Sequence, residues 1–281
     1  MIGFLICFQG TKYDTLGPTV PMPPDPICDI VDVQARDFSF APCDVKIHSP
    51  RIAQITDNPG KLGMNFEKAR FNMVEQQIRT WDVLDQQVLD IIASTARDEF
   101  VPEDYLGVSY SDTRIPIGHG ETMMAPKVEG RILQALRIGP ADRGLEVGTG
   151  SGFLTMLISQ MAKHLITMDV HEEFTHGAAK RLAARNTSNV DFVTQDGCGG
   201  YPEGGPFDFI AVTGAMATEN PALREQLAVG GRLFVIVGEL PIMEALLIER
   251  QSETVFASEA LFETELKYLL GAEAPAKFSF E

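Results

Sequence analysis

The stretch that decides the fold is "LEVGTGSGF", residues 145–153, in which Gly148, Gly150 and Gly152 stand at alternate positions. It follows a short apolar run and opens a segment with a helical pattern. Glycine lets the chain turn tightly there, and it lets the N–H groups at the start of a helix come close to a ligand. The stretch therefore predicts a strand, a ligand-binding turn and a helix, in that order.

Apolar runs rich in Val, Ile, Leu and Phe alternate with helical segments from this point on. The runs are 143–148, 164–170, 190–196, 207–214 and 231–238. Such uninterrupted runs, alternating with helices, indicate parallel strands that are covered on both faces. Two later pieces, 244–251 and 261–270, are expected to add edge strands. The predicted fold class is therefore α/β, with a doubly wound, mostly parallel sheet of seven strands.

The chain before this region has two parts. A helical pattern begins at Met64 and is interrupted around "TWDVLD" (80–85), which predicts an N-terminal helical addition to the sheet. Residues 1–63 hold 8 of the 17 prolines and no glutamate. We expect them to form a disordered, Pro-rich extension. It either results from a start codon assigned too far upstream or serves as a targeting or docking arm. The folded domain is expected to span 64–281.

Composition excludes several classes of protein. The net charge of −16 repels phosphate backbones, so nucleic acid is not expected as a partner. No apolar run is long enough to span a bilayer, and no basic residue precedes the apolar start "MIGFLICF". The four cysteines have no metal-ligand spacing. We therefore expect a cytoplasmic protein without a membrane segment or a metal site.

Two carboxylates follow the next two predicted strands. Asp169 ends the second run, and Asp196 with Gly197 ends the third. Ligands of open α/β sheets bind at this carboxyl edge, where an acidic residue accepts from ribose hydroxyls. The glycine spacing is GxGxG instead of the dinucleotide pattern GxGxxG, which disfavours a nicotinamide-dependent oxidoreductase. Together these features resemble the Rossmann-like S-adenosylmethionine-dependent methyltransferases; otherwise, each aspartate would cap a helix or a turn.

From about Met73 to Gly238 the chain resembles the protein-L-isoaspartate O-methyltransferase family. The matching pieces are "MVEQQIR", "EFVPEDY", "SYSDTRIPIGHGET", "GLEVGTGSGF", "TMDV", "QDG", "PFDFIAVTGA" and "VGGRLFVIVG". The resemblance implies that the cofactor is S-adenosylmethionine and that seven residues line it, namely Glu146, Gly148, Gly150, Gly152, Asp169, Asp196 and Gly197. It also implies that the loop 117–126 covers the methyl donor and receives an isoaspartyl-containing peptide or protein.

That loop, "IGHGETMMAP", departs from the family pattern. The family's active-site serine falls at Met124 and a family glutamine at Ala125, whereas Thr122 keeps its place. The catalytic candidates are Thr122, Met124 and His119. Methionine fills irregular gaps in a core, so Met123 and Met124 either pack beneath the loop or contact the substrate. His119 either orients a ligand or is satisfied by backbone.

The implied reaction is methyl esterification of the α-carboxylate of L-isoaspartyl residues in damaged proteins. A carboxylate is already nucleophilic at neutral pH, so the loss of one serine hydroxyl is expected to weaken the activity without abolishing it. Two alternatives stay open: a methyltransferase with another small-molecule or carboxylate acceptor, and a non-catalytic cofactor-binding module that acts through a partner. Asp112 is a further candidate, expected to hold the loop by hydrogen bonding.

Overall fold

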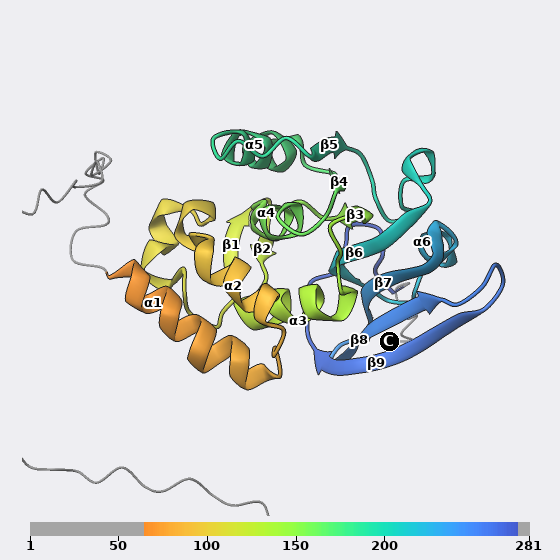
Figure 1. Cartoon of the computed structure of the whole chain (residues 1–281), viewed down its shortest axis with the longest axis horizontal. Coiled ribbons are helices and arrows are strands. Elements are labelled where there is room, and N and C mark those ends of the chain that lie inside the picture. The colour runs from red at the N-terminus through yellow and green to blue at the C-terminus, as the bar shows by residue number, and fades with distance from the viewer. Residues whose placement is uncertain (1–64, 275–281) are drawn as a thin grey trace, which may run out of the picture. The chain divides into compact units, whose positions relative to one another are not determined.

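A seven-stranded sheet organises the part of the chain that this computed structural model describes, residues 65–274 (Figure 1). Across the sheet the strands are β5 (Val190–Thr194), β4 (His164–Asp169), β3 (Arg143–Val147), β6 (Phe207–Met216), β7 (Leu227–Glu239), β8 (Ile242–Arg250) and β9 (Phe256–Thr264). The first five are parallel, while β8 and β9 are antiparallel. The predicted α/β class and its mostly parallel sheet of seven strands are confirmed.

The order of the strands reverses beside β3. From β3 the chain adds β4 and β5 on one side, and then crosses to add β6 and β7 on the other. The carboxyl ends of β3 and β6 therefore lie next to each other without a crossover covering both. Such a reversal leaves a crevice at the carboxyl edge of an α/β sheet, where ligands bind.

Six α-helices accompany the sheet within residues 65–274. They are α1 (Phe66–Asn72), α2 (Gln86–Ser94), α3 (Pro126–Leu136), α4 (Phe153–Ser159), α5 (Glu172–Ala183) and α6 (Pro221–Glu225). The chain continues from α1 through a π-helical and a 3₁₀ turn until Asp82, whose left-handed φ of 60° ends the helical run. Asp85 then caps α2 by accepting from the N–H groups of Gln87 and Val88. The expected interruption at 80–85 is thus explained.

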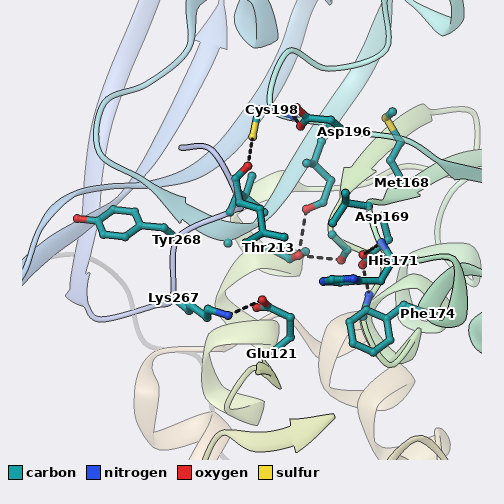
Figure 2. Close-up of a pocket in the computed structure, with 18 of the residues that line it drawn as sticks. Glu121, Met168, Asp169, His171, Phe174, Asp196, Cys198, Thr213, Lys267 and Tyr268 are labelled. Atoms are coloured by element: carbon teal, nitrogen blue, oxygen red, sulfur yellow. Dashed lines mark hydrogen bonds and ion pairs between the residues drawn. The ribbon is translucent and has the colours of Figure 1, made fainter. Parts of the chain in front are cut away.

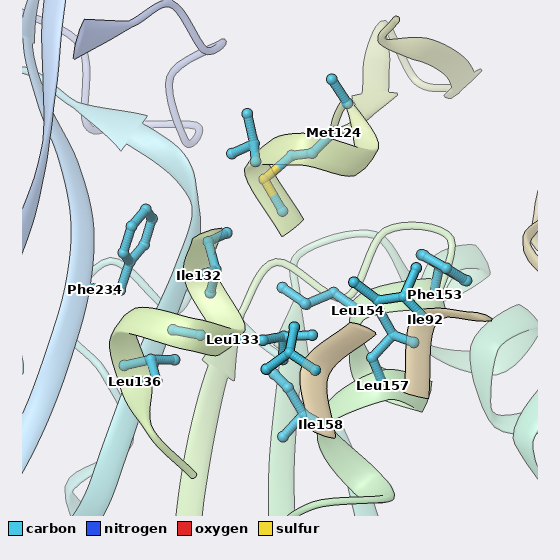
Figure 3. Close-up of a cluster of buried hydrophobic side chains, with 14 of the residues drawn as sticks. Ile92, Met124, Ile132, Leu133, Leu136, Phe153, Leu154, Leu157, Ile158 and Phe234 are labelled. Atoms are coloured by element: carbon cyan, nitrogen blue, oxygen red, sulfur yellow. The ribbon is translucent and has the colours of Figure 1, made fainter. Parts of the chain in front are cut away.

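Each face of the sheet has its own apolar core, which is why the strand sequences are apolar without alternation. On one face the buried side chains of α2, α3 and α4 pack together (Figure 3). They include Ile92, Ile132, Leu133, Leu136, Leu157 and Phe234 of β7. On the other face Leu223 of α6 packs against strand residues such as Ile210 and Val212.

A separate two-stranded hairpin precedes α3. Its strands are β1 (Ile115–Gly118) and β2 (Glu121–Met123), joined by His119 and Gly120. Both turn residues have positive φ, 52° and 72°, as a two-residue type I′ turn requires. Residues 117–123 of the loop 117–126 therefore belong to this hairpin.

The prediction for the second edge strand was wrong in its position. Strand β9 ends at Thr264, and the following residues leave the edge of the sheet and return to β6. There the N–H of Ala215 donates to the carbonyl of Lys267 (2.8 Å), and the N–H of Leu269 donates to the carbonyl of Ala215 (2.9 Å). Pairing with the free end of β6 outweighs the local strand pattern, because Leu266 is also buried there.

The extension 1–63 lies outside the described residues, so it remains a prediction. Within residues 65–274, which fall in a single unit of the chain, no helix is long and apolar enough to span a bilayer.

Candidate functional site

A pocket of about 270 Å³ opens at the carboxyl edge of the sheet, where the strand order reverses. Six segments form its walls (Figure 2): the β1–β2 hairpin, the glycine turn after β3, the residues that follow β4, those that follow β5, Thr213 and Gly214 of β6, and the segment 266–270. The first five come from regions that the sequence had singled out. The sixth, 266–270, had been expected to lie in an edge strand.

The glycine turn brings backbone to the pocket wall. Gly148 and Gly150 both line the cavity and have positive φ. A Cβ on Gly148 would lie 2.1 Å from the hydroxyl oxygen of Thr213, so only glycine fits at that position. Gly152 does not line the cavity; its missing side chain instead lets α4 approach α5, where a Cβ on Gly152 would lie 2.6 Å from that of Ala178. The structure thus places Gly152 outside the pocket wall, and its contact with the ligand stays a prediction.

The two carboxylates meet in this pocket as predicted from strand order. Asp169 is largely buried and accepts from the N–H groups of Gly150 and His171, each at 2.9 Å. Asp196 accepts from the N–H of Cys198 at 2.9 Å, and Gly197 lines the wall beside it. An ionised carboxylate has about four acceptor positions. Both aspartates therefore shape their turns and keep capacity for donors on a ligand.

Glu146 lies behind the glycine turn and is not in the pocket wall. Its side chain is fully buried, and one oxygen accepts from the hydroxyls of Thr155 (2.6 Å) and Thr167 (2.7 Å). Thr167 also contacts the hydroxyl of Thr149 within the turn, at 2.7 Å. Burial raises the pKa of Glu146 to about 8. Glu146 therefore supports the turn through threonine hydroxyls, and its direct contact with the ligand stays a prediction.

Met124 lies in the apolar core and not in the pocket wall (Figure 3). Its side chain and that of Met123 are buried, and the carbonyl of Met124 accepts from the guanidinium of Arg97. That guanidinium is itself fully buried and pairs with Glu129 of α3. Of the two hypotheses for Met124, the structure favours packing over contact with a substrate. Thr122, by contrast, does line the pocket.

His119 lies outside the pocket wall, but it holds the hairpin against the start of α5. Its ring stacks on that of His171, with centroids 4.3 Å apart, and meets the ring of Phe174 edge-on at 5.3 Å. His171 and Phe174 do line the pocket. Sequence reasoning missed both as site residues, although their position directly after Asp169 could have indicated them.

Several smaller expectations can also be placed. Asp112 forms an ion pair with Lys127 of α3 at 2.7 Å, just before the hairpin. Cys198 lines the pocket, where burial raises the pKa of its thiol to about 11 and leaves it protonated at neutral pH. In the described part of the chain no group of three histidine, cysteine or acidic side chains is placed to hold a metal ion.

The sheet order, the glycine turn and the paired aspartates define a Rossmann-like methyltransferase fold. A family model for protein-L-isoaspartate(D-aspartate) O-methyltransferase matches residues 68–266. The chain belongs to this family.

Individual relatives agree with this assignment. A protein-L-isoaspartate O-methyltransferase from Brucella anthropi is 36% identical over 212 residues, which are 75% of this chain and 97% of the relative. One from Koribacter versatilis is 36% identical over 194 residues, covering 69% and 86%. A crystal structure from Plasmodium falciparum, described as a putative protein of the same kind in complex with S-adenosyl-L-homocysteine, has a TM-score of 0.62 at 19% identity. The match covers 73% of this chain and 98% of the Plasmodium chain, and it supports the fold alone.

Proposed function

We propose that the protein transfers a methyl group from S-adenosylmethionine to the α-carboxylate of L-isoaspartyl residues in damaged proteins. The observation that carries the proposal is that Asp169 and Asp196 line the same pocket as Gly148 and Gly150, in a chain of this family. We further propose that the enzyme acts in the cytoplasm, that it binds neither nucleic acid nor membrane, and that residues 1–63 are not needed for its chemistry.

The residues present fit the cofactor. The cavity of about 270 Å³ is near the lower end of small-molecule pockets, which is ~300 Å³. We assign Asp169, which lines the pocket after β4, to the ribose hydroxyls, and Asp196, which lines it after β5, to the adenine amino group. The glycine backbone allows the close approach that a cofactor needs. When bound, S-adenosylmethionine supplies a methyl group on a positively charged sulfur.

The chain's own contribution is to bind the acceptor, align it and exclude water. A carboxylate needs no general base, and alignment with desolvation can account for ~7–11 kcal/mol of the barrier. Three hydroxyl side chains line the pocket. Thr213 donates to the carbonyl of Gly148 (2.7 Å) and Tyr268 to that of Gly238 (2.8 Å). The hydroxyl of Thr122 has no hydrogen-bond partner within residues 65–274, so we assign it to the acceptor.

The alternatives that remained open differ in what supports them. A different carboxylate or small-molecule acceptor was motivated by Met124 in place of the family serine. Since Met124 packs in the core, its replacement does not by itself make the pocket more apolar. A non-catalytic module that binds the cofactor and acts through a partner requires the same pocket, and only an assay separates it from the enzyme.

The decisive experiment compares an isoaspartyl peptide with its aspartyl twin, using labelled S-adenosylmethionine and the chain with and without residues 1–63. We expect transfer to the isoaspartyl peptide alone, in both forms of the chain, with label released as volatile methanol by base. An Asp169→Ala variant should lose cofactor binding. Cofactor binding without transfer to any peptide or metabolite fraction would support the non-catalytic module instead.

A further inference from the structure

The pocket is acidic, although its proposed acceptor is an anion. Among residues 65–274, three carboxylates line it: Glu121, Asp169 and Asp196. Lys267 is the one lysine or arginine in the same wall, again within the described part of the chain. The chain as a whole carries a net charge of −16, which adds to the repulsion of an anionic substrate. Among the described lysines and arginines, only Lys267 can therefore compensate the negative charge of a carboxylate that enters this pocket.

Lys267 is anchored at its backbone and accessible at its tip. The carbonyl of Lys267 accepts from the N–H of Ala215, which fixes the residue against the end of β6. Its ammonium nitrogen lies 2.5 Å from a carboxylate oxygen of Glu121 and 3.1 Å from the carbonyl of Gly120 (Figure 2). The Lys267 side chain is 45% exposed and that of Glu121 is 23% exposed. An ammonium has three donor positions, so one more acceptor can be bound even before Glu121 moves.

We propose that Lys267 recognises the acceptor carboxylate, and that Glu121 is an internal carboxylate that occupies the ammonium until a substrate displaces it. This inference rests on the proposed function, because it concerns the acceptor of that same reaction. It makes Lys267 a specificity-determining residue that distinguishes a free carboxylate from a neutral group of the same size. It also assigns a role to the segment 266–270, which had been expected to lie in an edge strand.

The chemistry explains why such a contact favours turnover. In the transfer an acceptor oxygen forms a bond to the methyl carbon while the carbon–sulfur bond breaks, and the electron pair stays on sulfur. No proton moves, so Lys267 acts neither as an acid nor as a base. The acceptor changes from a carboxylate to a neutral ester, and its attraction to Lys267 is lost. The ammonium then returns to Glu121, which favours release of the product.

The same geometry could also be a clamp that only ties the hairpin to the segment 266–270. The two roles differ in the effect of removing each partner. If the pair is a clamp, replacing either residue loosens the pocket and weakens substrate binding. If Glu121 competes with the substrate for Lys267, replacing Glu121 strengthens binding and replacing Lys267 weakens it. The opposite signs separate recognition from a structural role.

The experiment measures peptide binding by calorimetry with S-adenosylhomocysteine present, so that no turnover occurs. The probes are an isoaspartyl peptide and the same peptide with its free α-carboxylate converted to a carboxamide. The variants are Lys267→Gln, Lys267→Arg and Glu121→Gln. Arg114→Gln is the matched control, since Arg114 makes a similar exposed link to Glu265 (3.5 Å) outside the pocket wall.

For Lys267→Gln we expect the Kd of the isoaspartyl peptide to rise ~3- to 10-fold, somewhat above the value of a fully exposed pair. The preference of this variant for the isoaspartyl peptide over the carboxamide peptide should disappear. Lys267→Arg should keep the preference, Glu121→Gln should lower the Kd about 2-fold or more, and Arg114→Gln should change neither. In steady-state assays of Lys267→Gln the KM should rise and kcat should not fall, because an attraction that weakens toward the transition state stabilises the bound substrate more than the transition state.

The failures are distinguishable. If the wild-type chain neither binds nor methylates the isoaspartyl peptide, the proposed function is wrong. If it does both, and Lys267→Gln keeps the wild-type preference for the carboxylate, the assignment of Lys267 is overturned. If Glu121→Gln increases the Kd as much as Lys267→Gln does, the pair acts as a clamp and Glu121 does not compete with the substrate. Thermal unfolding of each variant verifies that it is folded. If Lys267→Gln does not fold, Glu121→Gln retains the test, because recognition predicts a lower Kd for it and a clamp predicts a higher one.

Discussion

Met124 shows how one residue can be recognised as unusual and still be misassigned. The sequence shows that a thioether stands where the family has an active-site serine. It does not show that the side chain points into the core, because the direction depends on the hairpin and on the carbonyl contact with Arg97. Thr122, two positions earlier, faces the pocket instead. In a continuous strand Thr122 and Met124, two positions apart, would point to the same side. They point to different sides because β2 ends at Met123 and the chain then turns into α3.

Replacing Met124 with serine is therefore expected to harm the protein. The change removes a buried side chain and buries a hydroxyl, which should lower the free energy of unfolding by ~2–5 kcal/mol. Turnover of an isoaspartyl peptide should not increase. Urea unfolding and initial rates at a temperature where both proteins are folded measure the two effects. A faster variant of unchanged stability would show that the side chain reaches the acceptor after all.

Glu146 gives a prediction about pH. Its folded pKa is about 8 because of burial, against 4.5 for the ordinary side chain, so unfolding between these pH values releases a proton. Raising the pH therefore destabilises the folded state, by up to ~1.4 kcal/mol per pH unit from this group. Glu146→Gln keeps an acceptor for Thr155 and Thr167 and removes the titration. Its stability relative to wild type should rise from pH 5 to pH 8 in urea unfolding; parallel profiles would contradict the raised pKa.

At the scale of secondary-structure elements, the strands of the parallel sheet were predictable and the last segment was not. The apolar runs at 143–148 and 207–214 need no tertiary information, because a strand buried on both faces is apolar throughout. The segment 265–270 has a strand-like sequence, but its partner is the end of β6, far away in the chain. Only the assembled sheet presents that partner. For the same reason Lys267 could not be identified as a site residue.

The buried pair of Arg97 and Glu129 connects three elements. Arg97 lies in a 3₁₀ turn, Glu129 in α3, and the guanidinium also binds the carbonyl of Met124 at the end of the hairpin. Arg97→Met leaves Glu129 buried and unpaired, which should cost ~3–5 kcal/mol of stability. The double variant with Glu129→Leu should recover a large part of that loss. Urea unfolding of the single and double variants measures it, and equal losses would show that the pair itself is unimportant.

For the molecule as a whole, net charge is the property that composition alone predicts. With −16 on the chain, a peptide with lysines flanking the isoaspartyl residue should have a lower KM than one with glutamates. The difference should shrink as salt is raised, since the Debye length is ~10 Å at 0.1 M and ~3 Å at 1 M. Steady-state kinetics at two salt concentrations measure this. A preference that is independent of salt would point to direct contacts with the flanking residues.

The return of the chain from β9 to β6 has a consequence for biosynthesis. The glycine turn and both aspartates leave the ribosome early, while the wall that carries Lys267 and Tyr268 emerges after the whole sheet has been made. A nascent chain that has reached only β7 can already form the parallel strands, yet it lacks one side of the cavity. Closure of the pocket, and with it recognition of the acceptor by Lys267, is thereby delayed until translation has passed β8 and β9.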